Sequence, residues 1–226
     1  MPRETLDRQI HQLQDEVLLL GSMVEQALLN AVDALKRRDI SAAQKIFAND
    51  ININEKRYAL ENALIIIIAT QQPMARDLRL LASVLETIIE LERIGDYAKG
   101  IAKVVIRLGD SMLPMPMREF SQMAEQAASM LHRALSAFIN EDASKAREIV
   151  LEDDQVDELY NKAYRAIVTT MIANPEIIDD ANLLVWVAHN LERAADRVTN
   201  ICERTVYIAT GELFELDTDD SEETAY

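Results

Sequence analysis

Apolar residues recur along the first 38 positions at alternating intervals of four and three. The series is Leu6, Ile10, Leu13, Val17, Leu20, Val24, Ala27, Ala31 and Ala34. This spacing places the apolar side chains on one face of an α-helix, as in the long helices of a bundle. It therefore predicts a helix over residues 5–38.

The rare Gly and Pro residues separate the rest of the chain into five further predicted helices. Asp39 or Ser41 can cap the first of them. The first of these five helices ends near residue 70. The next three cover 74–108, 117–139 and 143–173, and the last runs from the Asn174-Pro175 break to about residue 210. The segment 109–116 is the densest group of helix breakers and lies near the midpoint of the chain.

The two halves of the chain repeat one pattern. Asp39–Ile46 aligns with Asp142–Ile149 at an offset of 103 residues, and Leu91–Asp96 aligns with Leu191–Asp196 at an offset of 100. We therefore predict an all-α protein made of two tandem three-helix bundles related by an internal repeat. The predicted units are residues 1–110 and 111–211, followed by an acidic, loosely ordered tail at 212–226.

Composition and charge exclude several classes of protein. Of the 226 residues, 49% are apolar and only 5 are Gly and 5 Pro, which argues against a disordered chain or a β-sandwich. A net charge of −16 without a basic patch argues against nucleic acid as a partner. The single cysteine, Cys202, fits a reducing compartment, and the longest apolar run, Ala63–Ala69, is too short to span a bilayer. We expect a cytoplasmic protein without direct membrane insertion.

Carboxylates interrupt the apolar helix faces at equivalent places in both repeats. At ~100° per residue, they fall on the inward stripe of the second and third helices of each repeat. The set comprises Asp50, Glu92 and Asp96 in the first repeat, and Asp153, Asp157, Glu192 and Asp196 in the second. Asn54 replaces an acid in the first repeat, so we expect the first group to bind a metal ion more weakly than the second.

Acidic residues on an inward face are costly unless a cation neutralises them. A metal ion between two helices is one solution, because carboxylate oxygens suit Mg²⁺, Mn²⁺ or iron. Ion pairs with nearby arginines are a second, and a wet edge of the helix face is a third. The candidate arginines are Arg57, Arg93, Arg193 and Arg197.

Other residues of the chain also bear on its possible chemistry. His189 lies three positions before Glu192 and could add a nitrogen ligand, although a lone histidine is more often structural. We interpret Cys202 as a packing residue and Ile65–Ile68 as part of a helix buried on most sides. The sequence shows no nucleophile–base set, phosphate-binding loop or zinc signature, so we expect no enzymatic activity.

The duplicated motifs resemble the PhoU family of phosphate-uptake regulators. Leu91–Asp96 closes the first repeat, and the related segment Leu191–Ile201 closes the second. Gln72–Arg79, at the start of the third predicted helix, and the Asp50/Asn54 and Asp153/Asp157 pairs also match that family. The resemblance covers the chain up to the acidic tail.

The resemblance implies a cytosolic, non-enzymatic regulator that represses the phosphate-starvation response in high phosphate. Its implied partners are the ATPase subunit of the phosphate ABC transporter and a sensor histidine kinase, with a homodimer as a further expectation. Some members bind metal clusters through such motifs, which implies Fe, Mn, Mg or Zn at the seven carboxylates named above.

Two alternatives stay open. The first follows from the resemblance, because related families share this architecture: the chain could be an accessory protein of a low-affinity phosphate permease. It could also be a metal-binding helical bundle, with metal-dependent enzymatic chemistry as its least favoured form.

Overall fold

The computed structural model describes residues 2–109, 111, 113–213, 215 and 216. These residues form seven α-helices and one 3₁₀ turn and contain no β-strand. The elements are α1 (Pro2–Arg37), α2 (Ile40–Gln71), α3 (Arg76–Leu108), α4 (Met117–Ile139), α5 (Ala143–Val150), α6 (Asp153–Ala173), η1 (Pro175–Ile177) and α7 (Ile178–Thr210). The all-α prediction is confirmed.

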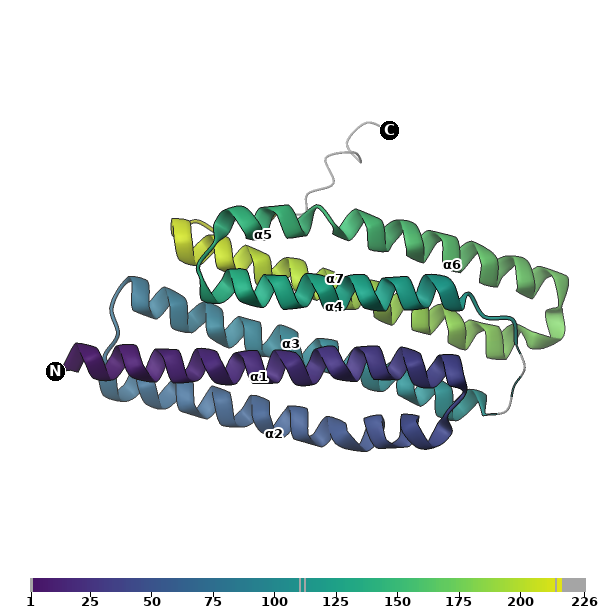
Figure 1. Ribbon diagram of the computed structural model, residues 1–226, viewed down its shortest axis with the longest axis horizontal. Helices are drawn as coiled ribbons and strands as arrows, with labels where there is room; N and C mark the ends of the chain where they lie inside the picture. The colour runs from purple at the N-terminus through teal and green to yellow at the C-terminus, as the bar shows by residue number, and fades with distance from the viewer. Residues whose placement is uncertain (1, 110, 112, 214, 217–226) are drawn as a thin grey trace.

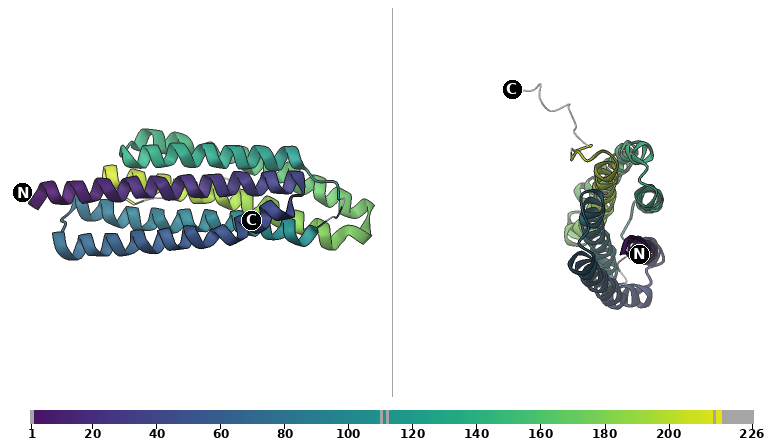
Figure 2. Two further views of the ribbon diagram at one scale, coloured as in Figure 1. Left: turned by 60° about the horizontal axis from the view of Figure 1, so that its bottom comes forward. Right: turned by 90° about the vertical axis from the view of Figure 1, so that its left-hand side faces the viewer.

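The long helices lie side by side and give the molecule an elongated shape (Figure 1). Helices α1, α2 and α3 pack together, as do α4, α5, α6 and α7. The two groups meet where α3 packs along α7 and α1 packs along α4, and Figure 2 shows both groups end on. Their buried residues form one continuous core, so the division near residue 110 stays a prediction.

Helix α1 confirms the pattern that predicted it. Eight of the nine apolar positions in the series are buried, and Ala27 is partly buried. A β-carbon at Gly21 would overlap the Cδ1 atom of Leu135, so glycine allows α1 to approach α4 closely.

Helix α1 is also long and apolar enough, over Glu4–Arg37, to meet the length and composition criteria for a membrane span. The core helix of a soluble protein meets the same criteria.

The predicted cap Asp39 is confirmed, and its repeat counterpart Asp142 caps the equivalent helix. Asp39 accepts a hydrogen bond from the backbone N–H of Ala42 at 2.8 Å, and Asp142 accepts one from Lys145 at 3.0 Å. Gly211 follows the end of α7 with φ of 82°, as a residue just beyond a helix requires. The prediction for the tail falls mainly on residues 217–226, which lie outside the described residues.

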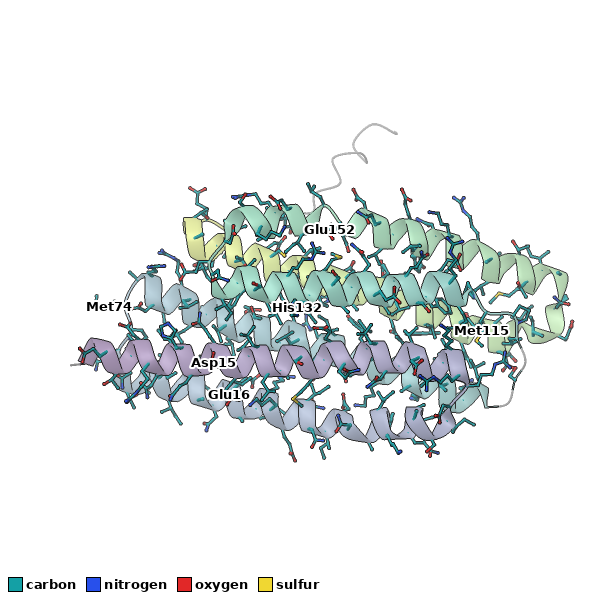
Figure 3. All side chains as sticks on the ribbon, in the orientation of Figure 1. Asp15, Glu16, Met74, Met115, His132 and Glu152 are labelled. Carbon is teal, nitrogen blue, oxygen red and sulfur yellow. The ribbon has the colours of Figure 1, made fainter. Side chains whose placement is uncertain are left out.

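The prediction of one helix over residues 143–173 is wrong. The helix breaks after Val150, and α6 begins at Asp153. Glu152 lies at this break (Figure 3). Its carboxylate accepts two hydrogen bonds of 2.5 Å from Arg133 and one of 2.9 Å from Gln126. The Glu152 N–H bonds the carbonyl of Ile149, a tighter turn than an α-helix makes. These tertiary contacts to α4 accompany the break.

The expectation that Ile65–Ile68 is buried on most sides is also wrong. Only Ile67 is buried, whereas Ile65 is 60% exposed and Ile66 is 49% exposed. The reason is the position of α2 at the edge of the bundle, where its main packing partners are α1 and α3. A helix with two neighbours on one side leaves its other face in solvent.

Candidate functional site

The predicted carboxylates form two groups, one in each half of the molecule. We call Asp50, Asn54, Glu92 and Asp96 the first cluster, carried by α2 and α3. The second cluster consists of Asp153, Asp157, Glu192 and Asp196, carried by α6 and α7. The clusters occupy equivalent positions of the sequence repeat, but their surroundings differ in charge.

The first cluster is neutralised by basic side chains of the protein. Lys99 Nζ lies 2.6 Å from Asp50 Oδ2 and 3.6 Å from Asp96 Oδ1. Asn54 Nδ2 donates to the same Asp50 oxygen at 2.9 Å. Arg57 Nη1 lies 2.9 Å from Glu92 Oε1. The ion-pair interpretation therefore holds for Asp50 and Glu92.

These contacts favour the charged forms of both basic groups. The hydrogen bond to Asp50 raises the pKa of Lys99 above its ordinary value, against the opposing effect of burial. The hydrogen bond to Glu61, with the charge of Glu92, raises the pKa of Arg57. Both cations therefore remain protonated beside the carboxylates at neutral pH.

The helical phase predicted from sequence is only partly correct. Asp50 and Asp153 are buried, but Asp96 and Asp157 are exposed. On α3 the buried face is centred on Val84 and Leu91, roughly 80–100° from Glu92 and roughly 120–140° from Asp96. The carboxylates therefore lie at the edge of the apolar face rather than in its middle.

In the second cluster, negative charges act on one another more strongly than in the first. Burial, followed by the negative charges of Asp196 and Asp157, raises the pKa of Glu192 from its ordinary value of 4.5 to about 7. Arg193 and Arg197 act in the opposite direction but do not cancel this effect. His189, which is half exposed, has its Nδ1 atom 3.3 Å from Glu192 Oε2.

The sequence repeat explains the difference between the clusters. Position 99 in the first repeat corresponds to Thr199 in the second, and position 57 corresponds to Tyr160. The two basic residues of the first cluster thus have neutral counterparts in the second. Consistent with this, burial and the charge of Glu192 raise the pKa of Tyr160.

The donor sets differ in how well they suit a metal ion. Within the part of the chain that the structure describes, no three His, Cys, Asp or Glu side chains are arranged as around a bound metal. The first cluster does not fit a metal ion, because Lys99 and Arg57 already contact its buried carboxylates. The second cluster fits by donor chemistry, since it combines several carboxylates with a raised pKa at Glu192.

Sequence reasoning missed a buried charge between the two halves. Glu90 on α3 is 6% exposed and faces α7. Arg197 Nη1 and Asn200 Nδ2 each lie 3.3 Å from Glu90 Oε2, and Arg93 Nη1 lies 3.0 Å from Glu90 Oε1. The sequence signal was a second stripe on the third predicted helix, with Ile94 and Ile101 at helical spacing from Glu90, which marks a helix covered on two sides.

The same junction contains a close backbone approach. A β-carbon at Gly100 would lie 2.8 Å from Asn190 Nδ2, so the glycine leaves space for the Asn190 side chain where α3 packs against α7. Asn190 is the repeat counterpart of Glu90, and Gly100 is the counterpart of Asn200. Two pairs related by the repeat therefore meet across the junction.

Cys202 confirms its interpretation as a packing residue. Its side chain is fully buried in α7. Burial raises the pKa of its thiol to about 12, so the thiol stays protonated at neutral pH.

We expect Glu192→Gln to stabilise the protein only at neutral and alkaline pH. Native Glu192 binds a proton up to about pH 7, and the unfolded residue only up to 4.5. Its contribution to stability is therefore complete below pH 4.5 and is lost as pH rises through about 7. Because part of the side chain is solvated, the variant should gain about 1–2 kcal/mol at alkaline pH and nothing in acid.

Urea unfolding in a chelating buffer, followed by circular dichroism across this pH range, measures the difference. Glu55→Gln, at an exposed position of α2, is the matched control and should show no such pH dependence. An equal effect of Glu192→Gln at every pH would contradict the raised pKa.

Comparisons with known proteins agree on one family. The family model described as "PhoU domain" matches residues 6–105 and 120–205. The "Phosphate-specific transport system accessory protein PhoU homolog" of Clostridium acetobutylicum is 32% identical over 96% of this chain and 100% of its own length. The homolog of the same name from Streptococcus pneumoniae is 35% identical over 95% of this chain and 100% of its own length. The crystal structure of PhoU from Pseudomonas aeruginosa superposes with a TM-score of 0.86 at 32% identity, covering 91% of this chain and 99% of that one.

Proposed function

Because the chain belongs to the PhoU family, we propose that it is a non-enzymatic accessory protein of phosphate transport. In this proposal it links the phosphate ABC transporter to a sensor histidine kinase and represses the phosphate-starvation response when phosphate is plentiful. The observation that carries the proposal is the full-length match to proteins named as accessory proteins of the phosphate-specific transport system.

An exposed apolar face offers a surface for a protein partner. Phe47, Ile51, Tyr58 and Ile65 recur along α2 and are 43%, 60%, 60% and 60% exposed. We call these four residues the α2 ladder. Large apolar side chains aligned on one exposed helix face are typical of interaction sites. We therefore propose that the α2 ladder is a contact surface for a protein partner of this chain.

The charge of the chain supports recruitment through proteins rather than through lipid. A net charge of −16 is repelled by the anionic inner leaflet of a membrane. We therefore propose that the protein is cytoplasmic and reaches the membrane through its partners. Phosphate status would then be read from the state of the transporter.

We further propose that the second cluster holds a cation, Fe, Mn, Mg or Zn, when one is bound. Glu192, Asp196, Asp157 and Asp153 would supply the oxygen ligands, with His189 at the edge. A multivalent cation there would neutralise the carboxylates and fix α6 against α7. Replacing Glu192 and Asp196 together should lower the metal content and leave the helical circular dichroism intact.

Deletion of the gene is expected to induce phosphate-starvation genes in phosphate-rich medium. The wild-type gene should restore repression, because the protein restrains the kinase. A variant with Ile51→Lys and Ile65→Lys should not restore it, because two charges on the α2 ladder disrupt an apolar contact. A reporter for the starvation response provides the measurement.

The control variant is Ile172→Lys on α6, which changes an apolar residue that is 76% exposed but lies away from the α2 ladder. It should restore repression like the wild type. Normal repression in the deletion strain would contradict the regulatory role. Repression restored by the double variant would contradict the assignment of the α2 ladder.

A further inference from the structure

We propose that Lys99, assisted by Arg57, is the built-in cation of the first cluster, so that this cluster holds no metal ion. The two clusters would then have different chemistry despite their common sequence pattern. The first would be closed to a metal ion by the protein's own side chains, and the second would lack the two basic residues that close the first. This inference concerns binding alone and does not depend on the regulatory role proposed above.

The position of Lys99 is the first argument. Its ammonium group contacts Asp50 on α2 at 2.6 Å and Asp96 on its own helix, α3, at 3.6 Å. It thus bridges the two helices between which an interhelical metal ion would lie. Asn54 fills a further site on the same Asp50 oxygen.

Arg57 completes the neutralisation at the other end of the cluster. Its guanidinium group lies 2.9 Å from Glu92 Oε1 and 2.8 Å from Glu61 Oε1. Glu92 and Arg57 are both largely shielded, with 15% and 24% of their side chains exposed. A metal ion that replaced these contacts would have to displace two cations and approach two positive charges.

The comparison between the repeats is the second argument. Thr199 and Tyr160, the counterparts of Lys99 and Arg57, carry no charge at neutral pH. In the second cluster Arg193 Nη1 lies 3.3 Å from Asp196 Oδ2, a pair within the single helix α7, and Arg197 contacts the buried Glu90. The positions of Lys99 and Arg57, which neutralise Asp50 and Glu92, therefore carry no charged residue in the second repeat.

The surroundings of Lys99 make the inference testable. Asp50 and Lys99 line a surface cavity of about 530 Å³ between α1, α2 and α3, together with Gln26, Asn30 and Asn49. Lys45 also lines the cavity, and the neutral amide groups would let a hydrated cation reach Asp50 once the Lys99 ammonium group was removed. Removing Lys99 should therefore convert a closed cluster into one that accepts a metal.

The experiment uses full-length protein in which Glu192→Gln and Asp196→Asn disable the second cluster. In this background, Lys99→Thr introduces the residue of the second repeat. Mn²⁺ alone is the probe, followed by isothermal titration and by thermal unfolding. Lys103→Thr, one turn further along α3 at an exposed position, is the matched control.

The background protein and the Lys103→Thr control should show no saturable Mn²⁺ binding up to about 1 mM. Lys99→Thr should unfold at a temperature lower by roughly 5 °C without metal, because Asp50 loses its cation. It should bind Mn²⁺ at least roughly tenfold more tightly than the background, with recovery of part of the lost melting temperature.

Lys99→Gln keeps a hydrogen-bond donor for Asp50 and serves as the second variant if Lys99→Thr does not fold. It should also gain Mn²⁺ binding, because it removes the positive charge. Saturable binding by the background protein, with Lys99 intact, would overturn the proposal. So would the absence of any gain in the folded Lys99 variants.

Discussion

Glu90→Ala is expected to lower the free energy of unfolding by about 3–5 kcal/mol, among the largest effects of any single change in this chain. Glu90 is 6% exposed and lies between α3 and α7. Its carboxylate is the acceptor for Arg197, whose side chain is only 12% exposed. Without Glu90, the Arg197 guanidinium would remain buried without this counter-charge, which is why the cost is high.

Urea unfolding at neutral pH measures the effect. Glu158→Ala is the control, because Glu158 and Lys162 form an exposed ion pair with 74% and 61% of their side chains in solvent. That change should cost less than about 1 kcal/mol. Replacing Glu90 and Arg197 together by leucine and methionine should recover most of the loss, since no charge is then buried alone.

A small effect of Glu90→Ala, equal to that of Glu158→Ala, would mean that Arg197 reaches solvent or another acceptor at no cost. The Glu90 pairing would then be a minor feature of the junction. The double variant separates this outcome from a simple loss of packing, because leucine and methionine keep most of the volume.

Leu20→Ala is expected to lower the free energy of unfolding by about 2–5 kcal/mol. Leu20 is fully buried in α1, the helix that packs against α2, α3 and α4. The next residue, Gly21, lies against Leu135 of α4, so the surrounding backbone has little freedom to close a new cavity.

Leu19→Ala is the matched control, because Leu19 is the preceding residue of the same helix and is 51% exposed. It should change stability by less than about 1 kcal/mol. Equal effects of the two substitutions would show that the helical phase of α1 is wrong. Thermal and urea unfolding with circular dichroism detection distinguish the two outcomes.

The ion-pair hypothesis describes the first cluster, and the metal hypothesis stays a prediction for the second. From the sequence, Asp50 and Glu92 had either a metal ion or nearby basic residues as possible partners. The structure shows Lys99 and Arg57 at these carboxylates. At Glu192 the balance of charge is different, because burial and two other carboxylates act on it together. The duplicated motif therefore does not imply duplicated chemistry.

Sequence reasoning was most successful where a signal is local or strictly periodic. The spacing from Leu6 to Ala34 predicted α1 and its buried face, and Asp39 and Asp142 were recognisable as equivalent helix starts. It failed where burial depends on the number of neighbours. Ile65 and Ile66 are apolar but exposed, because α2 lies at the edge of the bundle.

The sequence by itself determined most of the helices, the internal repeat and the presence of carboxylates near the apolar faces, because all three follow from short-range spacing, whereas the break between α5 and α6 did not. Only the tertiary structure decided which cation meets each carboxylate and that Glu90 is buried between α3 and α7. Lys99 and Asp50 are 49 residues apart, and Arg197 and Glu90 are 107 apart. Helical periodicity fixes which face a side chain occupies, but only the packing of distant helices brings such partners within hydrogen-bonding distance.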